Sequence, residues 1–150
     1  MFMDWQARYY PIDVFDTLRA NIETLIASGQ AQSVELVREE LKAVAPPAVF
    51  AWVKAQSGLF VPLDAELQSA GAAIEASYPD LADPKGIYQS ADAYVIALAK
   101  VRGWTVVTQE TPAAEKKNPK QAHYIPDACR ELGIPCISLV GLLRQQRWRL

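Results

Sequence analysis

The chain has 150 residues, of which 51% are hydrophobic and 21% are charged, with a net charge of −2. This length suits one domain with a buried core, and this composition excludes the disordered and fibrous classes. Two cysteines do not make a disulfide framework, and a single histidine disfavours a zinc site of ordinary ligand spacing. We expect a cytoplasmic protein with reduced thiols, no signal peptide and no membrane-spanning segment.

The charged residues are distributed unevenly along the chain. Residues 1–99 contain 6 Lys/Arg and 13 Asp/Glu, whereas residues 100–150 contain 9 Lys/Arg and 4 Asp/Glu. An acidic region beside a basic region would suit a metal site next to a phosphate-binding surface. Taken alone, the charge pattern is explained more simply by two sets of solvated helices.

The first two thirds of the chain are predicted to be helical, because apolar residues recur with the helical period. Ser33 and Asp64 are the expected N-caps of two of these helices, and Gly29 and Gly58 stop two others. The predicted helices cover residues 12–28, 34–44, 47–56 and 65–76. The segment 78–89 contains two prolines and a glycine and is predicted to be a loop.

The last third is predicted to alternate helices and strands. Ser90 should cap a helix over 91–102, and further helices should begin at Pro126 and near Leu139. Short β-branched runs predict buried strands at 104–108 and 134–138, and the polar stretch 111–124 reads as a loop. A β-α-β unit of this kind has parallel strands with a right-handed crossover. We therefore predict an α/β fold in one domain, residues 1–150.

Two acidic residues occupy positions where ligands bind in such folds. Asp92 lies in the first turn of a helix, where the helix dipole keeps a carboxylate ionised. Glu110 follows the carboxyl end of the strand 104–108, together with Thr108. Two carboxylates brought together in this way could bind one Mg²⁺ or Mn²⁺. Considered singly, Asp92 is more simply a first-turn helix acid and Glu110 a solvated loop acid.

The order of elements and the amino-acid sequence of four stretches resemble the PIN-like domain family. The resemblance is to a bacterial PIN-like family of unnamed function in particular, which is related to VapC-type toxin ribonucleases. The stretches are RYYPIDVF, SVELVREEL, SADAYVIALAKVRGWTVVTQE and YIPDACRELGIPCISL. Together they span most of the chain, and the third is long and specific. The resemblance implies a three-layer fold in which helices flank a central parallel sheet.

The resemblance also implies a metal site for phosphodiester hydrolysis. PIN domains use about four acids to hold Mg²⁺ or Mn²⁺ while water attacks the phosphorus. Carried over by motif, the catalytic and metal-binding residues are Glu40, Asp92 and Glu110, with Glu39 as the alternative to Glu40. Thr108 corresponds to the family's small hydroxyl residue, a contact for phosphate or water.

The beginning of the chain departs from the family pattern. Residues 1–3 correspond to the apolar stretch that follows the family's first strand and its aspartate. The resemblance therefore places that strand and that aspartate upstream of Met1. Either the start of the chain has been assigned too late, or the chain is a natural truncation. Without them a sheet strand and a central ligand are lost, so we expect marginal stability and little or no activity from the 150-residue form.

Three lysines in the loop after Glu110 form a second candidate surface. Lys116, Lys117 and Lys120 would bind RNA phosphates in a nuclease, or would simply keep a loop soluble. The first functional hypothesis is a toxin-type endoribonuclease with an RNA substrate, a controlling antitoxin and, by family expectation, a homodimer. The alternative is a non-catalytic PIN-like module that binds RNA or a protein partner. A metal-dependent phosphatase or a DNA-directed nuclease would use similar carboxylates.

Overall fold

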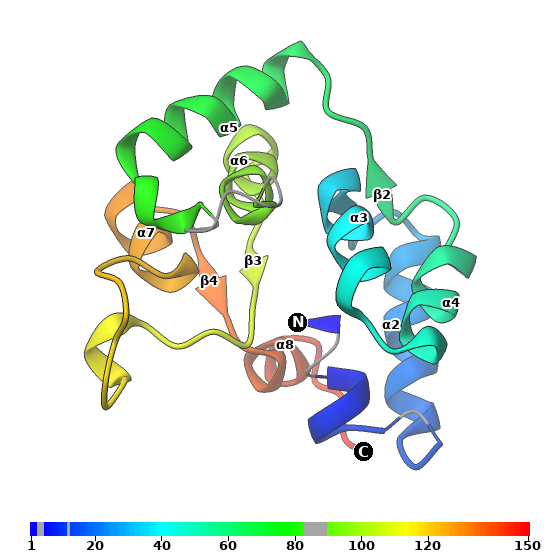
Figure 1. Cartoon of the computed structure of the whole chain (residues 1–150). Coiled ribbons are helices and arrows are strands. Elements are labelled where there is room, and N and C mark those ends of the chain that lie inside the picture. The colour runs from blue at the N-terminus through cyan, green and yellow to red at the C-terminus, as the bar shows by residue number, and fades with distance from the viewer. Residues whose placement is uncertain (3–4, 12, 83–89) are drawn as a thin grey trace.

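The helices form two groups that lie on opposite sides of the computed structural model of the chain (Figure 1). The structure describes residues 1–2, 5–11, 13–82 and 90–150. One group contains η1 (Trp5–Tyr9), α2 (Asp16–Ala27), α3 (Glu35–Val44) and α4 (Pro47–Ala55). The other contains α5 (Ala65–Ser77), η2 (Pro79–Leu81), α6 (Asp92–Arg102), η3 (Ala113–Glu115) and α7 (Ile125–Leu132). The last helix, α8 (Leu139–Gln145), lies near the amino terminus, between the two groups.

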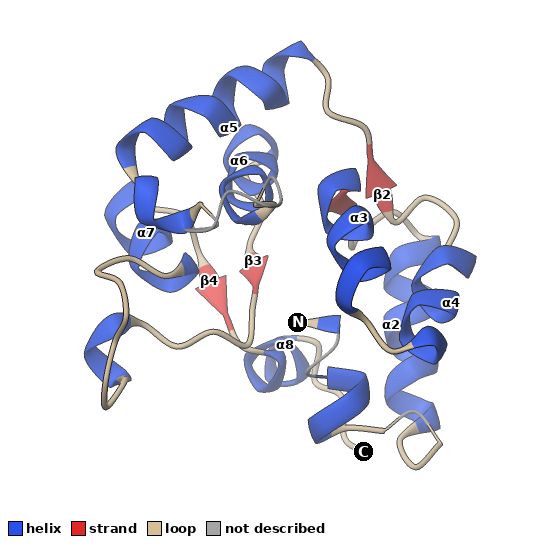
Figure 2. Cartoon of the chain, in the orientation of Figure 1, coloured by secondary structure: helices blue, strands red, loops and turns tan. Residues whose placement is uncertain are grey.

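The strands are short and form two separate parallel pairs (Figure 2). In the first pair, β1 (Ser33–Val34) aligns Ser33 with Phe60 of β2 (Phe60–Val61). In the second, β3 (Val106–Val107) aligns Val106 with Cys136 of β4 (Cys136–Ile137). The prediction of a mixed α/β chain with parallel strands in its last third is confirmed. The strands predicted at 104–108 and 134–138 are each only two residues long in the structure.

The prediction that Ser33 caps a helix was wrong. Its backbone N–H donates to the carbonyl of Leu59 at 2.7 Å, which makes Ser33 part of β1. Val34 stays extended as the N-cap of α3, and the helix begins only at Glu35. The partner strand β2 was not predicted, because two residues between a glycine turn and a proline are too few to show a strand period.

Most helix boundaries follow from local sequence signals. The Asp64 carboxylate accepts a hydrogen bond from the N–H of Leu67 at 2.8 Å and caps α5, as predicted. Gly103 and Gly133 end α6 and α7 in the left-handed conformation, with φ of 67° and 71°. The helix predicted over 12–28 begins at Asp16; residue 12, like 83–89 of the predicted loop, lies outside the described residues.

The N-cap of α6 is Ala91 rather than the predicted Ser90. The Ser90 hydroxyl still helps to begin the helix, because it accepts a hydrogen bond from the N–H of Asp92 at 3.4 Å. It also donates to the carbonyl of Leu81 at 2.9 Å, which ties the start of α6 to η2. Since Asp92 is a candidate ligand, this contact contributes to fixing the candidate site.

Each group of helices has its own apolar core. In the group that contains α6, the buried residues include Ile96, Ala128 and Cys129. In the other group, Trp5 is fully buried and its ring meets Trp52 edge-on, with centroids 5.1 Å apart. None of the helices in the described ranges is long and apolar enough to cross a membrane.

Candidate active site

A cavity of about 700 Å³ lies between the two groups of helices. Its walls are mostly apolar and come from both groups, with Ile22 on one side and Leu98 on the other. Residues of both strand pairs also line it, among them Ser33 of β1 and Val107 of β3. Glu40 and Asp92 are the acidic side chains among the described residues of its lining. An apolar cavity that contains two carboxylates is an unfavourable place for uncompensated charge.

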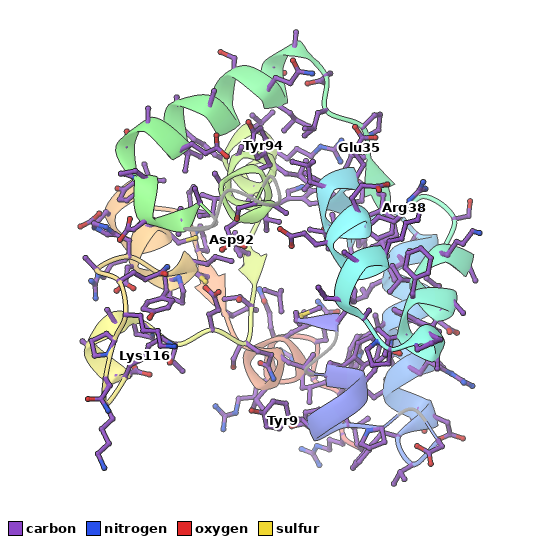
Figure 3. All side chains as sticks on the ribbon, in the orientation of Figure 1. Tyr9, Glu35, Arg38, Asp92, Tyr94 and Lys116 are labelled. Carbon is purple, nitrogen blue, oxygen red and sulfur yellow. The ribbon has the colours of Figure 1, made fainter. Side chains whose placement is uncertain are left out.

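Asp92 carries the most perturbed carboxyl group of this site. It is half-buried at the first position of α6. Figure 3 labels its side chain there. Burial raises its pKa to about 7, and the negative charges of Glu110 and Glu40 act in the same direction. The ammonium group of Met1 opposes them. Near neutral pH this carboxyl therefore exists in both protonation states, as expected where like charges gather in a poorly solvated site.

Glu40 reaches this site from the opposite group of helices. Its carboxylate accepts a hydrogen bond at 2.8 Å from the N–H of Ala91, the residue that precedes Asp92. Burial raises the pKa of Glu40, and the Ala91 hydrogen bond and the Met1 ammonium group partly offset that effect. Its neighbour Glu39 is exposed and lies 3.9 Å from Arg38. The structure thus places Glu40, rather than the alternative Glu39, on the cavity.

Glu110 approaches from the carboxyl end of β3. Its carboxylate accepts a hydrogen bond at 3.0 Å from the N–H of Ile125, at the start of α7. Its own N–H donates to the hydroxyl of Thr108 at 3.2 Å. Thr108 is buried, lines the cavity and donates its N–H to Ile137 of β4 at 3.0 Å. Glu110 itself is exposed and does not line the cavity, although its charge acts on Asp92.

The three acids are neighbours without forming a ready-made ligand cage. Within the described ranges, no group of three or more His, Cys, Asp or Glu side chains has the spacing needed to hold a metal ion. Glu40 and Glu110 each accept a backbone N–H instead. The donor chemistry nevertheless fits a hard divalent cation, because carboxylate and hydroxyl oxygens are the ligands that Mg²⁺ and Mn²⁺ prefer.

The three lysines lie apart from the cavity lining, in the segment that follows β3. The Lys116 ammonium lies 4.2 Å from the centre of the Tyr124 ring, a cation–π contact that holds this side chain on the protein. Lys117 and Lys120 are exposed, and the N–H of Lys120 donates to the Tyr124 hydroxyl at 3.1 Å. Figure 3 shows Lys116 on the same half of the molecule as Asp92. Two lysines of this loop are thus available to solvent anions.

Asp127 supports this region and was missed in the sequence. It is 4% exposed, and its carboxylate accepts hydrogen bonds from the N–H groups of Ala113 at 3.0 Å and Tyr124 at 2.9 Å. These bonds fasten both ends of the lysine-bearing loop to the start of α7. An acid three residues after a helix N-cap is the signal that would have found it.

The match with a known family covers the whole chain. The pattern of the family described as a domain of unknown function (DUF4411) matches residues 1–150. The chain belongs to this family. Comparison with curated proteins and with solved structures gives no match. Any functional conclusion therefore depends on the residues of the site.

Proposed function

We propose that this member of the DUF4411 family is a metal-dependent endoribonuclease of the toxin–antitoxin type. One observation carries the proposal: burial raises the pKa of Asp92 to about 7, and the negative charges of Glu110 and Glu40, which come from two other segments of the chain, act in the same direction. A cluster of carboxylates that destabilises its own charge in this way gains stability by binding a cation. Nucleases that cut phosphodiester bonds use such clusters for Mg²⁺ or Mn²⁺.

Each residue of the site has a distinct part in this proposal. Glu40, Asp92 and Glu110 would hold the cation, which supplies an activated water and neutralises phosphate charge. The Thr108 hydroxyl, fixed at the strand end, would orient a phosphate oxygen or a water. The apolar walls of the cavity limit competing water, which strengthens every charge interaction beside them.

The exposed lysines suit a polyanionic substrate. Lys117 and Lys120 lie in the loop that follows Glu110, and their ammonium groups would contact phosphates of the RNA backbone. Contacts of this kind contribute affinity without base specificity. Asp127 would maintain the position of the loop through its two backbone hydrogen bonds.

We also propose that the two strand pairs are the two halves of one PIN-like sheet. The backbone N–H groups of Val106 and Thr108 donate to β4 and the residue before it. Because successive N–H groups of a strand point to opposite edges, the N–H of Val107 points to the other edge of β3. The backbone N–H of Ser33 points toward β2, so the backbone N–H of Val34 points to the other edge of β1. Residues of both strands line the same cavity. An extended segment placed there would join the pairs into the central layer of a three-layer fold.

Metal binding and RNA cleavage test the proposed activity. We expect Mn²⁺ to bind the protein by calorimetry, and Glu40→Gln and Asp92→Asn each to weaken binding at least tenfold. Glu39→Gln removes one charge from the same helix without touching the cavity, so it is the matched control and should bind normally. Cleavage of a single-stranded RNA should require Mn²⁺ and should fall with Asp92→Asn. Equal Mn²⁺ affinity in all four proteins would defeat the proposal.

A non-catalytic module that binds RNA or a protein partner is the second candidate. It is favoured by the engagement of Glu40 and Glu110 with backbone N–H groups, which gives both acids a structural role. This candidate predicts no metal-dependent heat and no RNA cleavage. It also predicts RNA binding that depends on Lys117 and Lys120 and is unaffected by Asp92→Asn.

A further inference from the structure

The two cysteines of the chain lie against each other, at the junction of α7 and β4. Cys129 is fully buried on α7, and Cys136 is half-buried on β4. Both are free thiols, and their side chains are joined by a hydrogen bond. Two neighbouring thiols, one of them accessible to solvent, are the arrangement found in redox-active dithiol sites.

The backbone between them holds the pair in place. The chain turns at Gly133, and the N–H of Ile134 donates to the carbonyl of Cys129 at 2.8 Å. The next residue, Pro135, accepts a hydrogen bond from Val106 of β3 at 2.8 Å, which fixes the start of β4. The bonds at both ends of this short turn fix the backbone of Cys129 and Cys136 relative to each other.

The two thiols are not equivalent. The hydrogen bond from Cys129 lowers the pKa of Cys136, against the opposing effects of burial and of the Glu110 charge. The same bond and complete burial raise the pKa of Cys129. Cys136 is therefore both the more accessible thiol and the better nucleophile, and Cys129 is placed to react with it in a second step.

We propose that Cys129 and Cys136 are a redox-active dithiol that a hydroperoxide converts into an intramolecular disulfide. The Cys136 sulfur attacks the peroxide and forms an S–O bond as the O–O bond breaks, which yields a sulfenic acid and one water. The Cys129 sulfur then attacks the Cys136 sulfur and forms the S–S bond, which releases a second water. Two thiols and one hydrogen peroxide thus become one disulfide and two waters, with two electrons passing from sulfur to oxygen.

The position of the pair connects it to the candidate site, although the inference does not depend on the proposed function. Cys129 lies one helical turn after Ile125, whose N–H donates a hydrogen bond to the Glu110 carboxylate at 3.0 Å. Cys136 pairs with Val106, two residues before Thr108. A disulfide would cross-link α7, whose first residue donates its N–H to Glu110, to β4, whose Ile137 accepts the N–H of Thr108. Any oxidant that reaches Cys136 would therefore act on the supports of the acid cluster.

Mass spectrometry of the native protein tests the inference directly. The reduced protein is treated with a small excess of hydrogen peroxide, and its intact mass should fall by two hydrogens and return with dithiothreitol. Trypsin cuts after Arg130, so the disulfide should join peptides 121–130 and 131–144. Retention of both thiols would overturn the proposal, as would sulfinic acid without a disulfide or a disulfide formed only between two chains.

Two single-cysteine variants assign the order of the steps. In Cys129→Ser, Cys136 should form a sulfenic acid that dimedone traps, since no second thiol can condense with it. In Cys136→Ser, the buried Cys129 should stay reduced under the same treatment. Preferential trapping at Cys129 would contradict the proposed order. If either variant fails to fold, the wild-type mass and peptide measurements still decide whether the disulfide forms.

Discussion

Glu40 lies close to Asp92 because the Glu40 carboxylate accepts the N–H of Ala91, the residue before Asp92, at 2.8 Å. This bond joins α3 of one helical group to the start of α6 in the other. The Ala91 N–H is one of the donors that a helix start leaves without an intrahelical partner, and Glu40 satisfies it. The same contact places two negative charges close together, which contributes to the raised pKa of Asp92. Capping of α6 and charge repulsion are therefore two effects of one contact.

The first prediction concerns this coupling. Glu40→Gln keeps a hydrogen-bond acceptor for Ala91 but removes the charge, so the pKa of Asp92 should fall from about 7 toward its ordinary value of 3.8. Burial and Glu110 still act, so the fall should be partial. Titration of the Asp92 carboxyl carbon by NMR measures the change. Glu39→Gln removes an exposed charge one residue away and should leave the titration of Asp92 unchanged; a similar shift in both variants would contradict the direct coupling.

The second prediction concerns the pH dependence of stability. The pKa of Asp92 is about 7 in the folded protein against an ordinary 3.8, so the folded state binds the proton more tightly than the unfolded state between these values. Stability therefore falls as pH rises through this interval and levels off above it. A shift of this size corresponds to a free energy on the order of 4 kcal/mol. Asp92→Asn cannot ionise and should lack this loss.

Denaturant unfolding at pH 4, 6 and 8 measures that difference. The stability of Asp92→Asn relative to the wild type should increase steadily from pH 4 to pH 8, because only the wild type acquires the buried charge. Other titrating groups affect both proteins alike and cancel in the comparison. Two curves that stay parallel across the whole range would show that Asp92 does not titrate between these pH values.

The third prediction uses the metal as a stabiliser. A cation that binds only the folded state raises stability by about 2.7 kcal/mol when its free concentration is one hundred times Kd. At pH 8, where Asp92 is ionised, Mn²⁺ should therefore raise the Tm of the wild type and of Glu39→Gln alike. Asp92→Asn, with its weaker Mn²⁺ binding, should show a clearly smaller increase. An equal increase in all three proteins would place the bound metal elsewhere.

Local sequence patterns predicted the helices better than the strands for a physical reason. A helix such as α5 repeats its apolar period over several turns, and Asp64 and Gly103 mark boundaries through hydrogen bonds and backbone angles that are local. The strands β1 and β2, which were not predicted, are two residues long and exist because of distant partners, as Ser33 does through Leu59. No periodicity can reveal an element of that length.

The candidate site shows the same limit. The sequence pattern selected Asp92, Glu110 and Thr108, because strand ends and helix starts converge in α/β folds. Glu40, with Glu39 as the alternative, came from the family resemblance, because the local pattern does not show which of the two faces Ala91, 51 residues further along the chain. The local pattern also missed Asp127, whose two hydrogen bonds reach both ends of a loop. Residues that act through tertiary contacts leave little local signal.

The fourth prediction tests the packing that supports Asp92. Helices α5 and α6 pack closely at Gly71, where an added Cβ would overlap the ring of Tyr94. Gly71 is buried and Tyr94 lies two residues after Asp92, so neither can move without displacing the start of α6. Gly71→Ala should therefore lower the free energy of unfolding by about 1–3 kcal/mol, despite the higher helix propensity of alanine.

A matched substitution on the same helix separates packing from propensity. Ser69 is exposed on α5, so Ser69→Ala should change the free energy of unfolding by no more than about 0.5 kcal/mol. Because the Gly71→Ala clash pushes on Tyr94, it should also weaken Mn²⁺ binding, whereas Ser69→Ala should not. If Gly71→Ala is as stable as Ser69→Ala, then α5 and α6 do not pack in the contact described, and the position of Asp92 must be fixed by Glu40 and Ser90 instead.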